Sequence, residues 1–453
     1  MSIDPSVERA ALVVDDALHD SRVLDVTVGG GRARLARFAD GRIHQSTDES
    51  WLAARVVVDT NGRRGVAETT DISAAGLSRA TDRASEIADA SPAAPDALPP
   101  VHPEEDAPHV DDGASWDRQL HETGVAWLTD AAATALFMAR PRSLRAAGFA
   151  RVTDGAMTDY GDPGVLAFGN RLGLRRRHAR TTIDAAVMFR DEDGNTGWAS
   201  DAAGVRGAFD IEATCERALR RVQANRNPAA LEVGRYRTIL SPEAVAALLP
   251  FVTQTFSADA VARGTSLLSG HDGSPLAAEL LSLHADPAAL GAPSFDGEGV
   301  LSSPLTLLNT GRPQHLARDR RDQQRDGIPT NGYSPSLPSH HPARPRSLVL
   351  RGGNGTAEEL EARHPNAIAV SRLWYNRLVD ARAVRVTGLT RDGFFERERG
   401  VVTRALLNMR YNVSVFDMLR NVVDASAPVR VGDVLAPALV VDAFPFTAAA
   451  SRV

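Results

Sequence analysis

The sequence WLAARVVVDTNGRRGVAET, residues 51–69, has the pattern of a β-hairpin. Trp51 to Asp59 is rich in valine, and Arg64 to Thr69 comes after it, beyond a short polar break. The break contains Asn61-Gly62, a dipeptide that readily adopts the left-handed backbone conformation of a two-residue hairpin turn. The stretch therefore predicts two antiparallel strands and, with them, a strand-rich N-terminal region.

The residues before this hairpin extend the strand pattern towards the N-terminus. Apolar positions at helical spacing predict an opening helix over Val7 to His19. Short strands are expected at Val23–Val28 and Arg34–Phe38, bounded by the turn signals Gly29-Gly30-Gly31 and Asp40-Gly41. The predicted order is therefore a helix and then a meander of strands.

A second helix and a linker are expected after the hairpin. Asp71 or Ser73 provides an N-cap for a helix that runs to about Ala90. Residues 91–112 are rich in Pro, Ala, Asp and Glu without periodicity, which favours a linker or a long surface loop. Beyond it, the pattern predicts a helix over 116–138, strands near 148–152, 165–169 and 180–190, and an amphipathic helix over 210–224.

An Asn-Arg-Asn-Pro stretch at residues 225–228 ends that helix and suggests a domain boundary. We therefore expect an N-terminal domain over residues 1–228 and a C-terminal domain over residues 229–453. The second domain opens with a strand at Tyr236–Leu240, and Ser241-Pro242 is a favourable helix start.

Strands dominate the rest of the second domain after a long loop. Residues 311–346 are rich in Arg, Pro, Gly and Ser, and a segment of that length is either functional or mobile. Thr356 with Glu359 resembles a capping box, and Ser414 with Asp417 opens a short helix. Strands are expected at 367–370, 383–389, 394–398, 401–407 and 438–444. The predicted class is α+β, with an N-terminal α/β domain of strand meanders and flanking helices and a C-terminal domain rich in antiparallel strands.

Composition excludes several classes of function. All 51 basic residues are arginine, so no lysine is available for a Schiff base or a phosphate loop. Cys215 is the only cysteine, which excludes a disulfide framework and any multi-cysteine metal site. The net charge of −6 disfavours a general nucleic-acid binder. Neither a membrane-spanning run nor a secretory signal is recognisable, so a cytoplasmic location is expected.

The common catalytic and metal-binding motifs are also missing from the sequence. No two of the twelve histidines stand four or five residues apart, as a helical zinc site requires. There is no Gly-x-Ser-x-Gly elbow, and Cys215 lies within a predicted helix, which favours burial in a core. Gly29-Gly30-Gly31 and residues 352–355 do not have the spacing of a dinucleotide site, so hairpin turns are expected at both.

Two groups of residues remain as candidates for function. Asp296 and Glu298 are carboxylates two residues apart in a glycine-rich segment, suited to acid–base chemistry or to cation binding. The alternative is a tight turn with solvated acids. Trp374 and Tyr375 lie on a predicted strand near Arg372 and Arg377, where they would either line a ligand channel or pack in a core.

Several stretches in order along the chain resemble the TldD/PmbA family, and within it the TldE (PmbA) side. They are RFADGRIHQ (37–45), FGN (168–170), SFDGEGV (294–300), RLWY (372–375), VTGLTRDG (386–393), MLRNV (418–422) and PALVV (437–441). No single stretch is specific, but the ordered set covers nearly the whole chain. The resemblance implies a two-domain subunit that pairs with a TldD-like partner into a heterodimer enclosing a peptide channel.

The family also implies where zinc binds. In the TldD subunit a helix carries His-Glu-x-x-x-His, and a later cysteine completes the site. The equivalent helix here comes after the strand Tyr236–Leu240, and residues 245–256 contain neither histidine nor glutamate. The C-terminal half has no cysteine. We therefore expect no catalytic residue, metal or cofactor in this chain, and zinc in the partner subunit.

The leading hypothesis is a non-catalytic, substrate-positioning subunit of a heterodimeric zinc metallopeptidase acting on small or unfolded peptides. A strand edge would hold the extended peptide by backbone pairing. One alternative is a subunit of a related hydrolase that tailors a specialised metabolite, and another is a regulatory binding protein without a peptidase partner. The candidate substrate-binding residues are Asn170, Asp296, Glu298, Arg372, Trp374 and Tyr375.

Overall fold

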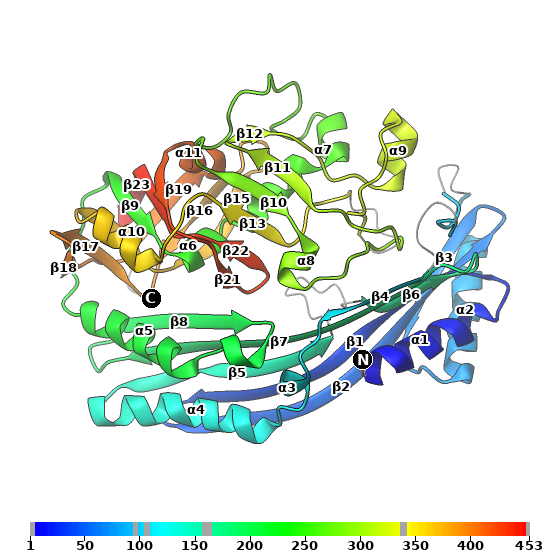
Figure 1. The fold of residues 1–453 in the computed structure, drawn as a ribbon, viewed down its shortest axis with the longest axis horizontal. Helices are drawn as coiled ribbons and strands as arrows, with labels where there is room; N and C mark the ends of the chain where they lie inside the picture. The colour runs from blue at the N-terminus through cyan, green and yellow to red at the C-terminus, as the bar shows by residue number, and fades with distance from the viewer. Residues whose placement is uncertain (1–4, 94–97, 104–108, 156–164, 336–341, 450–453) are drawn as a thin grey trace.

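The computed structural model describes residues 5–93, 98–103, 109–155, 165–335 and 342–449. These residues form three β-sheets with helices on their outer faces, so the α+β class predicted from the sequence is confirmed. Figure 1 shows the first sheet as a long curved layer, with the two sheets of the second half stacked above it. None of the described helices combines the length and the apolar content that a membrane crossing requires.

The first sheet is built entirely from the N-terminal half. Its strand order is β3-β2-β1-β5-β7-β4, with β6 beside β1 and β7, and β8 beside β7. The elements of this half are α1 (Pro5–Leu18), β1 (Val23–Ala39), β2 (Arg42–Thr60), β3 (Arg63–Thr69), α2 (Ala74–Ala90), β4 (His109–Ser115), α3 (Arg118–His121), α4 (Val125–Ala139), η1 (Arg140–Arg142), β5 (Arg145–Gly155), β6 (Val165–Asn170), β7 (Arg175–Arg190), β8 (Thr196–Ala203), η2 (Arg206–Ala208) and α5 (Ile211–Ala224).

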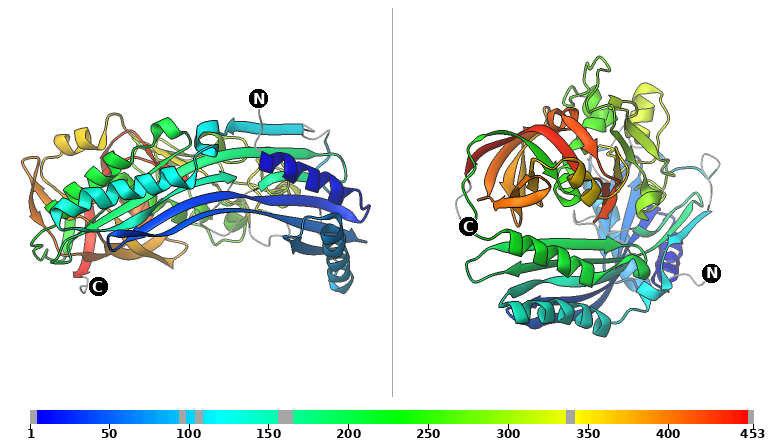
Figure 2. Two further views of the ribbon diagram at one scale, coloured as in Figure 1. Left: turned by 90° about the horizontal axis from the view of Figure 1, so that it is seen from below. Right: turned by 60° about the vertical axis from the view of Figure 1, so that its left-hand side comes forward.

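Two hydrophobic cores lie between this sheet and its helices. At one end α4 and α5 pack on the sheet around Phe38, Val152 and Ile183. At the other end α1 and α2 cover β1, β2 and β3, with Val26 and Val56 in the core between them. Figure 2 shows these two helix pairs at opposite ends of the long sheet. The opposite face of the sheet is thereby left for the second half of the chain.

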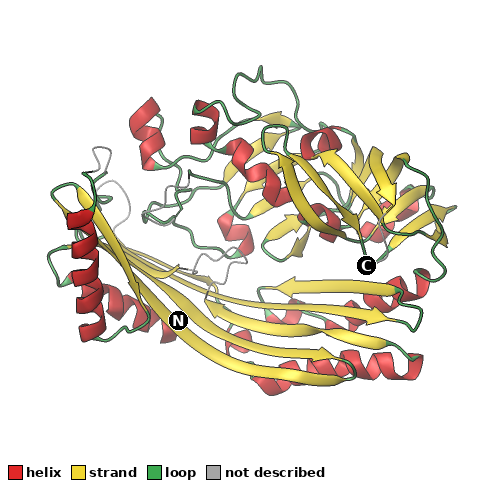
Figure 3. Cartoon of the chain, turned by 180° about the vertical axis from the view of Figure 1, so that it is seen from behind, coloured by secondary structure: helices red, strands yellow, loops and turns green. Residues whose placement is uncertain are grey.

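The second half forms a six-stranded and a nine-stranded sheet around one large core. Their orders are β12-β11-β10-β13-β22-β21 and β15-β16-β19-β23-β9-β14-β17-β18, with β20 beside β23. The elements are β9 (Gly234–Leu240), α6 (Pro242–Ala246), η3 (Leu249–Phe256), α7 (Ala258–Ala262), β10 (Ser282–Ala285), α8 (Pro287–Leu290), β11 (Leu305–Asn309), β12 (Arg312–Pro313), α9 (Arg320–Asp326), β13 (Leu348–Arg351), α10 (Ala357–Arg363), β14 (Ala367–Val370), β15 (Leu373–Asp380), β16 (Arg385–Thr390), β17 (Phe394–Glu398), β18 (Val401–Ala405), β19 (Met409–Ser414), α11 (Val415–Arg420), β20 (Val422–Ala425), β21 (Val429–Val431), β22 (Val434–Ala436) and β23 (Leu439–Ala449). Figure 3 shows the short helices of this half around its strands.

Polar contacts join the two halves. Arg180 of β7 pairs with Asp433 at 2.6 Å, and Thr196 of β8 donates to Asp392 at 2.8 Å. The buried side chain of Arg176 donates to the carbonyl of Gly299 at 2.8 Å. Because these partners are more than 100 residues apart in sequence, they fix the position of the second half on the first sheet.

The glycine run at residues 29–31 is not the predicted hairpin turn. It lies inside β1, which is one continuous strand where two short strands were expected. At this point β1 exchanges one neighbour for another, from β6 up to Gly29 to β5 from Gly31 onward. A Cβ on Gly31 would lie 2.0 Å from the carbonyl oxygen of Asp154, so only glycine allows the backbones to approach there.

Other sequence expectations require smaller corrections. The helix expected over 116–138 is broken into α3 and α4 at Thr123-Gly124. Residues 352–355 connect β13 to α10 and are not a hairpin turn. The expected linker at 91–112 ends in strand β4, whose first residue is His109. Within the long 311–346 loop, the described residues include strand β12 and helix α9.

Candidate functional site

The candidate site is built around the SFDGEG turn, residues 294–299. The Asp296 carboxylate accepts backbone N–H groups of Glu298 at 2.9 Å and of Val300 at 3.0 Å through Oδ1. Its Oδ2 accepts the N–H of Ser334 at 2.9 Å. These three bonds shape the turn and fasten it to a distant loop. The Asp296 side chain therefore stabilises the turn and its contact with the loop at Ser334.

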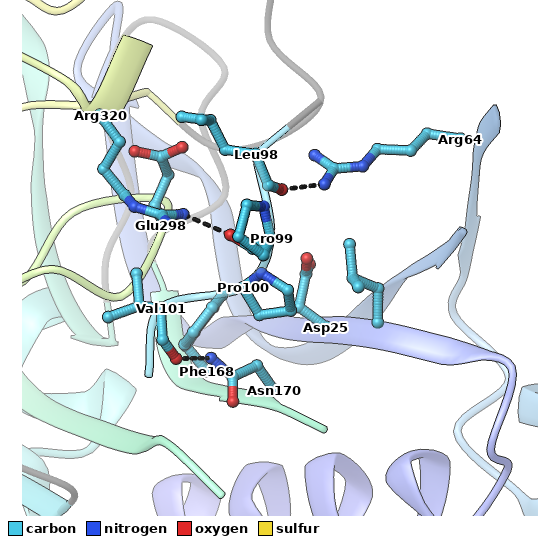
Figure 4. Close-up of a pocket in the computed structure, with 11 residues that line it drawn as sticks. Asp25, Arg64, Leu98, Pro99, Pro100, Val101, Phe168, Asn170, Glu298 and Arg320 are labelled. Carbon is cyan, nitrogen blue, oxygen red and sulfur yellow. Dashed lines mark hydrogen bonds between the residues drawn. The ribbon is translucent and has the colours of Figure 1, made fainter. Parts of the chain in front are cut away.

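Glu298, on the same turn, lines a small pocket between the two halves of the chain. The side chains of Asp25 on β1, Arg64 on β3, Asn170 on β6 and Arg320 on α9 face the same space (Figure 4). Leu24, Phe168 and the segment 98–101 complete the lining. Glu298 is 5% exposed, and no hydrogen-bond partner for its Oε2 is present in the part of the chain that the structure describes.

The segment Leu98–Val101 lines this pocket and is neither helix nor strand (Figure 4). Arg320 donates to the carbonyl of Pro99 at 2.6 Å, and Asn170 Nδ2 donates to the carbonyl of Val101 at 2.8 Å. Arg64 donates to the carbonyl of Leu98. Each of these three carbonyl groups is thus held by a side chain from a different element.

The carboxyl groups around the pocket bind their protons more tightly than usual. Burial raises the pKa of Asp25 to about 7, against the opposing effect of Arg64. Burial and the neighbouring charge of Asp296 raise the pKa of Glu298 to about 8. Burial also raises the pKa of Asp296 to about 6, although its three N–H donors favour the charged form. Burial and the charge of Asp296 therefore favour the protonated form of Glu298.

The three remaining candidate residues form a second cluster at the start of β15. The Arg372 guanidinium lies between the rings of Trp198 and Trp374, at 4.2 and 4.3 Å from their centroids. It also pairs with Asp392 at 2.8 Å. Because Trp198 belongs to β8 of the first sheet, Arg372 connects the two halves of the chain. This side chain has a clear structural role.

Tyr375, by contrast, is directed away from the core. It is 61% exposed, and Arg377 stacks on its ring at 4.6 Å. β15 lies at one end of the nine-stranded sheet, beside β16, and exposes Trp374, Leu378 and Val379 as well. The register of β15 shifts near Tyr375, whose φ of 56° is in the left-handed region. The described part of this strand is an exposed, partly apolar sheet edge.

Sequence reasoning missed three of the five polar residues that line the pocket, Asp25, Arg64 and Arg320. Asp25 carried a signal, because it is the one charged residue in the apolar run 23–28 and has no sequence neighbour to pair with it. Arg64 and Arg320 could not be singled out from the sequence. Every basic residue of this chain is arginine, so an arginine at a given position is not distinctive. Their role is apparent only from the fold, which brings β3 and α9 to the same segment.

The region after β9 does not offer the ligands of a zinc site. Over residues 242–256 it forms α6 and the 3₁₀-helix η3, and its one titratable side chain is Glu243. Burial would raise the pKa of Glu243, but Arg221 at 3.2 Å and the hydrogen bonds at the helix start together outweigh this effect and lower the pKa. Among the described residues, no three His, Cys, Asp or Glu side chains are grouped as a metal ion requires. Within the described ranges, the region after β9 therefore offers a catalytic metal no histidine and no unpaired carboxylate.

Residues 233–448 match the family model of the PmbA/TldA metallopeptidase C-terminal domain. This places the second half of the chain in a metallopeptidase-type family. A protein named metalloprotease from Methanothermobacter thermautotrophicus is 25% identical over 209 residues, which are 43% of this chain and 45% of that protein.

The fold of nearly the whole chain is shared with three solved structures. TldE from Thermococcus kodakarensis matches with a TM-score of 0.81 and 16% identity, over 98% of this chain and 100% of that one. Two proteins assigned as candidate modulators of DNA gyrase also match. The one from Thermotoga maritima has a TM-score of 0.75 and 16% identity over 97% and 99% of the two chains. The one from Bacteroides thetaiotaomicron has a TM-score of 0.79 and 14% identity over 99% and 100%. The family match over residues 233–448 and the shared fold of nearly the whole chain together support the TldD/PmbA family.

Proposed function

We propose that this chain is the zinc-free, substrate-positioning subunit of a heterodimeric TldD/TldE-type metallopeptidase. The proposal is supported by the composition of the region after β9. Its helices α6 and η3 contain no histidine, and their one carboxylate, Glu243, is paired with Arg221. A zinc hydrolase needs a metal and a carboxylate base. Both would come from a partner carrying His-Glu-x-x-x-His, and the shared fold with TldE supports this assignment.

The edge strand β15 is our candidate for the wall that positions a peptide. An extended peptide adds to a sheet edge by backbone hydrogen bonds, and pockets for its side chains provide specificity. β15 offers such an edge with the exposed rings of Trp374 and Tyr375 beside it. The expected substrates are small or unfolded peptides, because backbone pairing needs an extended chain and reads little sequence.

Co-expression with a His-Glu-x-x-x-His paralogue tests the proposal. We expect a 1:1 complex in which zinc and peptide cleavage are found only in the pair or in the paralogue, and this chain alone to contain no stoichiometric zinc. Replacing the paralogue's glutamate by glutamine provides the control, since it should abolish cleavage and leave the complex intact. Stoichiometric zinc and peptide cleavage by this chain alone would overturn the assignment.

A further inference from the structure

The way the segment 98–101 is held indicates a site that reads peptide backbone. Three donors from three elements, Arg64, Asn170 and Arg320, each bind one of its carbonyl oxygens. Asn170 is fixed for this task, because its Oδ1 accepts the backbone N–H of Leu174 at 3.2 Å and leaves Nδ2 directed at the segment. Side chains that are held in place before a ligand arrives are the usual basis of specific binding.

One side chain of the segment is also bound in a preformed apolar pocket. Val101 is 3% exposed and packs with Phe168 and Leu174 of the first half and with Phe295 of the second. An apolar anchor combined with donors for the carbonyl groups is the arrangement by which proteins bind extended peptides. The groove between the two halves therefore has the parts of a peptide site, and Leu98–Val101 occupies it.

The segment is nevertheless a poor match for the floor of the groove. The carbonyl of Pro99 accepts a hydrogen bond from Arg320, but Pro99 and Pro100 have no N–H and can donate nothing to the buried carboxyl groups. Asp25 is 4% exposed and Glu298 5% exposed, and both line the same pocket as the prolines. Within the described ranges, Glu298 Oε2 has no hydrogen-bond partner. An occupant with N–H groups would provide the donors that the prolines lack.

We propose that this groove is a peptide-binding site and that Leu98–Val101 is its internal, exchangeable occupant. The ligand class is an extended peptide with an apolar side chain at the position of Val101 and N–H or ammonium donors facing Glu298 and Asp25. The proposal rests on the proposed function for the identification of the ligand as a peptide. It places a second contact with substrate at the junction of the halves, apart from the edge strand β15.

Fluorescence anisotropy with a labelled hexapeptide, Gly-Leu-Ala-Ala-Val-Ala, tests the proposal on the full chain without a partner. The matched probe Gly-Leu-Pro-Pro-Val-Ala lacks two N–H groups. Val101→Ser removes the apolar anchor and should displace the segment from the groove. Val101→Asp should displace it more strongly, because a carboxylate cannot be buried beside Phe168 and Leu174 without a partner. Arg320→Ala removes one of the side chains that donate to the carbonyl groups of the segment. Arg321→Ala, on the same helix, is its control.

We expect both Val101 variants to bind the Ala-Ala probe at least fivefold more tightly than the wild-type chain. The Ala-Ala probe should also bind more tightly than the Pro-Pro probe. When Arg320→Ala is added to either Val101 variant, the increase in affinity for the Ala-Ala probe should disappear. When Arg321→Ala is added instead, the increase should remain. Equal affinities for the wild-type and both Val101 variants, or a gain that survives Arg320→Ala, would overturn the proposal. Failure to pair with a zinc subunit would count against the proposed function alone.

Discussion

The guanidinium of Arg34 and the carboxylate of Asp154 form an ion pair at 2.7 Å in which neither side chain is more than 1% exposed. The two residues join β1 to β5 in the first sheet. Asp154 also lies 3.1 Å from His121 Nδ1, and Arg34 donates to the carbonyl of Thr123 at 2.9 Å. The pair thereby fixes α3 and the break before α4 on the face of the sheet.

Asp154→Ala is expected to destabilise the protein strongly, because it leaves the Arg34 charge buried without its partner. Loss of one member of a buried pair typically costs about 3–5 kcal/mol. Asp184→Ala is the matched control, since its pair with Arg151 at 2.9 Å is about one quarter exposed on both sides. Partly exposed pairs contribute roughly 0–1 kcal/mol. Urea denaturation of both variants checks this, and equal losses would contradict it.

Local features of the fold were predictable where a few adjacent residues determine them. The Asn61-Gly62 turn joins β2 to β3, with φ values of 55° and 76°. Ser241 caps α6, and the capping box of Thr356 with Glu359 opens α10. In each case the hydrogen bond that defines the feature joins atoms within four residues, so the sequence contains the whole interaction.

Features that depend on distant segments were not predictable in the same way. A glycine run signals a turn, but Gly30 and Gly31 lie within β1, where the backbones of β2 and β5 leave no room for a Cβ. Asn170 and Glu298 were chosen from motifs and line the same pocket, yet their binding role stays a prediction. Arg64 and Arg320 could not be chosen, because only the tertiary fold brings β3 and α9 to residues 98–101.

Arg372→Ala should lower stability, because Arg372 connects the halves through Trp198 and Asp392. A desolvated cation–π contact and an ion pair are lost together, and we expect about 1–3 kcal/mol. Arg377→Ala is the control, since Arg377 stacks on the exposed ring of Tyr375 within one strand. Thermal melting monitored by tryptophan fluorescence measures the difference, and identical melting curves for the two variants would refute it.

Tyr375→Ala should separate function from stability. The ring is 61% exposed, so its removal should change the free energy of unfolding by less than about 0.5 kcal/mol. In the pair with a zinc subunit, the same change should lower peptide cleavage at least threefold if β15 positions the substrate. Val401→Ala, on the exposed strand β18 at the other end of the sheet, is the matched control. Unchanged cleavage by the Tyr375 variant would argue against β15 as the channel wall.

Cys215 should be inert towards thiol reagents in the native protein. It is fully buried in α5, and burial raises the pKa of its thiol to about 12. The thiolate that reacts is therefore scarce at pH 8, and the reagent has no access to the sulfur. Labelling with a chromogenic disulfide should be absent in buffer and stoichiometric in denaturant. Rapid native labelling would show that α5 opens locally.

Stability should fall as the pH rises from about 5 to 8.5, and Glu298 should account for part of the fall. Its pKa is about 8 in the folded chain against an ordinary value of 4.5. The folded state therefore holds the proton more tightly, and this contribution is present at low pH and lost as the pH rises through the folded pKa. Glu298→Gln keeps the shape of the side chain and cannot ionise.

The melting temperature of the Glu298→Gln variant should therefore exceed that of the wild-type chain by a few degrees at pH 8.5, and the gap should close at pH 5. Asp25 and Asp296 titrate in both proteins, so the difference between the two profiles reports the loss of the Glu298 carboxyl group together with its effect on Asp296. Glu358→Gln, an exposed change of the same kind on α10, should run parallel to the wild type at every pH. A Glu298→Gln profile that also runs parallel would show that this carboxyl group keeps an ordinary pKa and that the floor of the groove is hydrated.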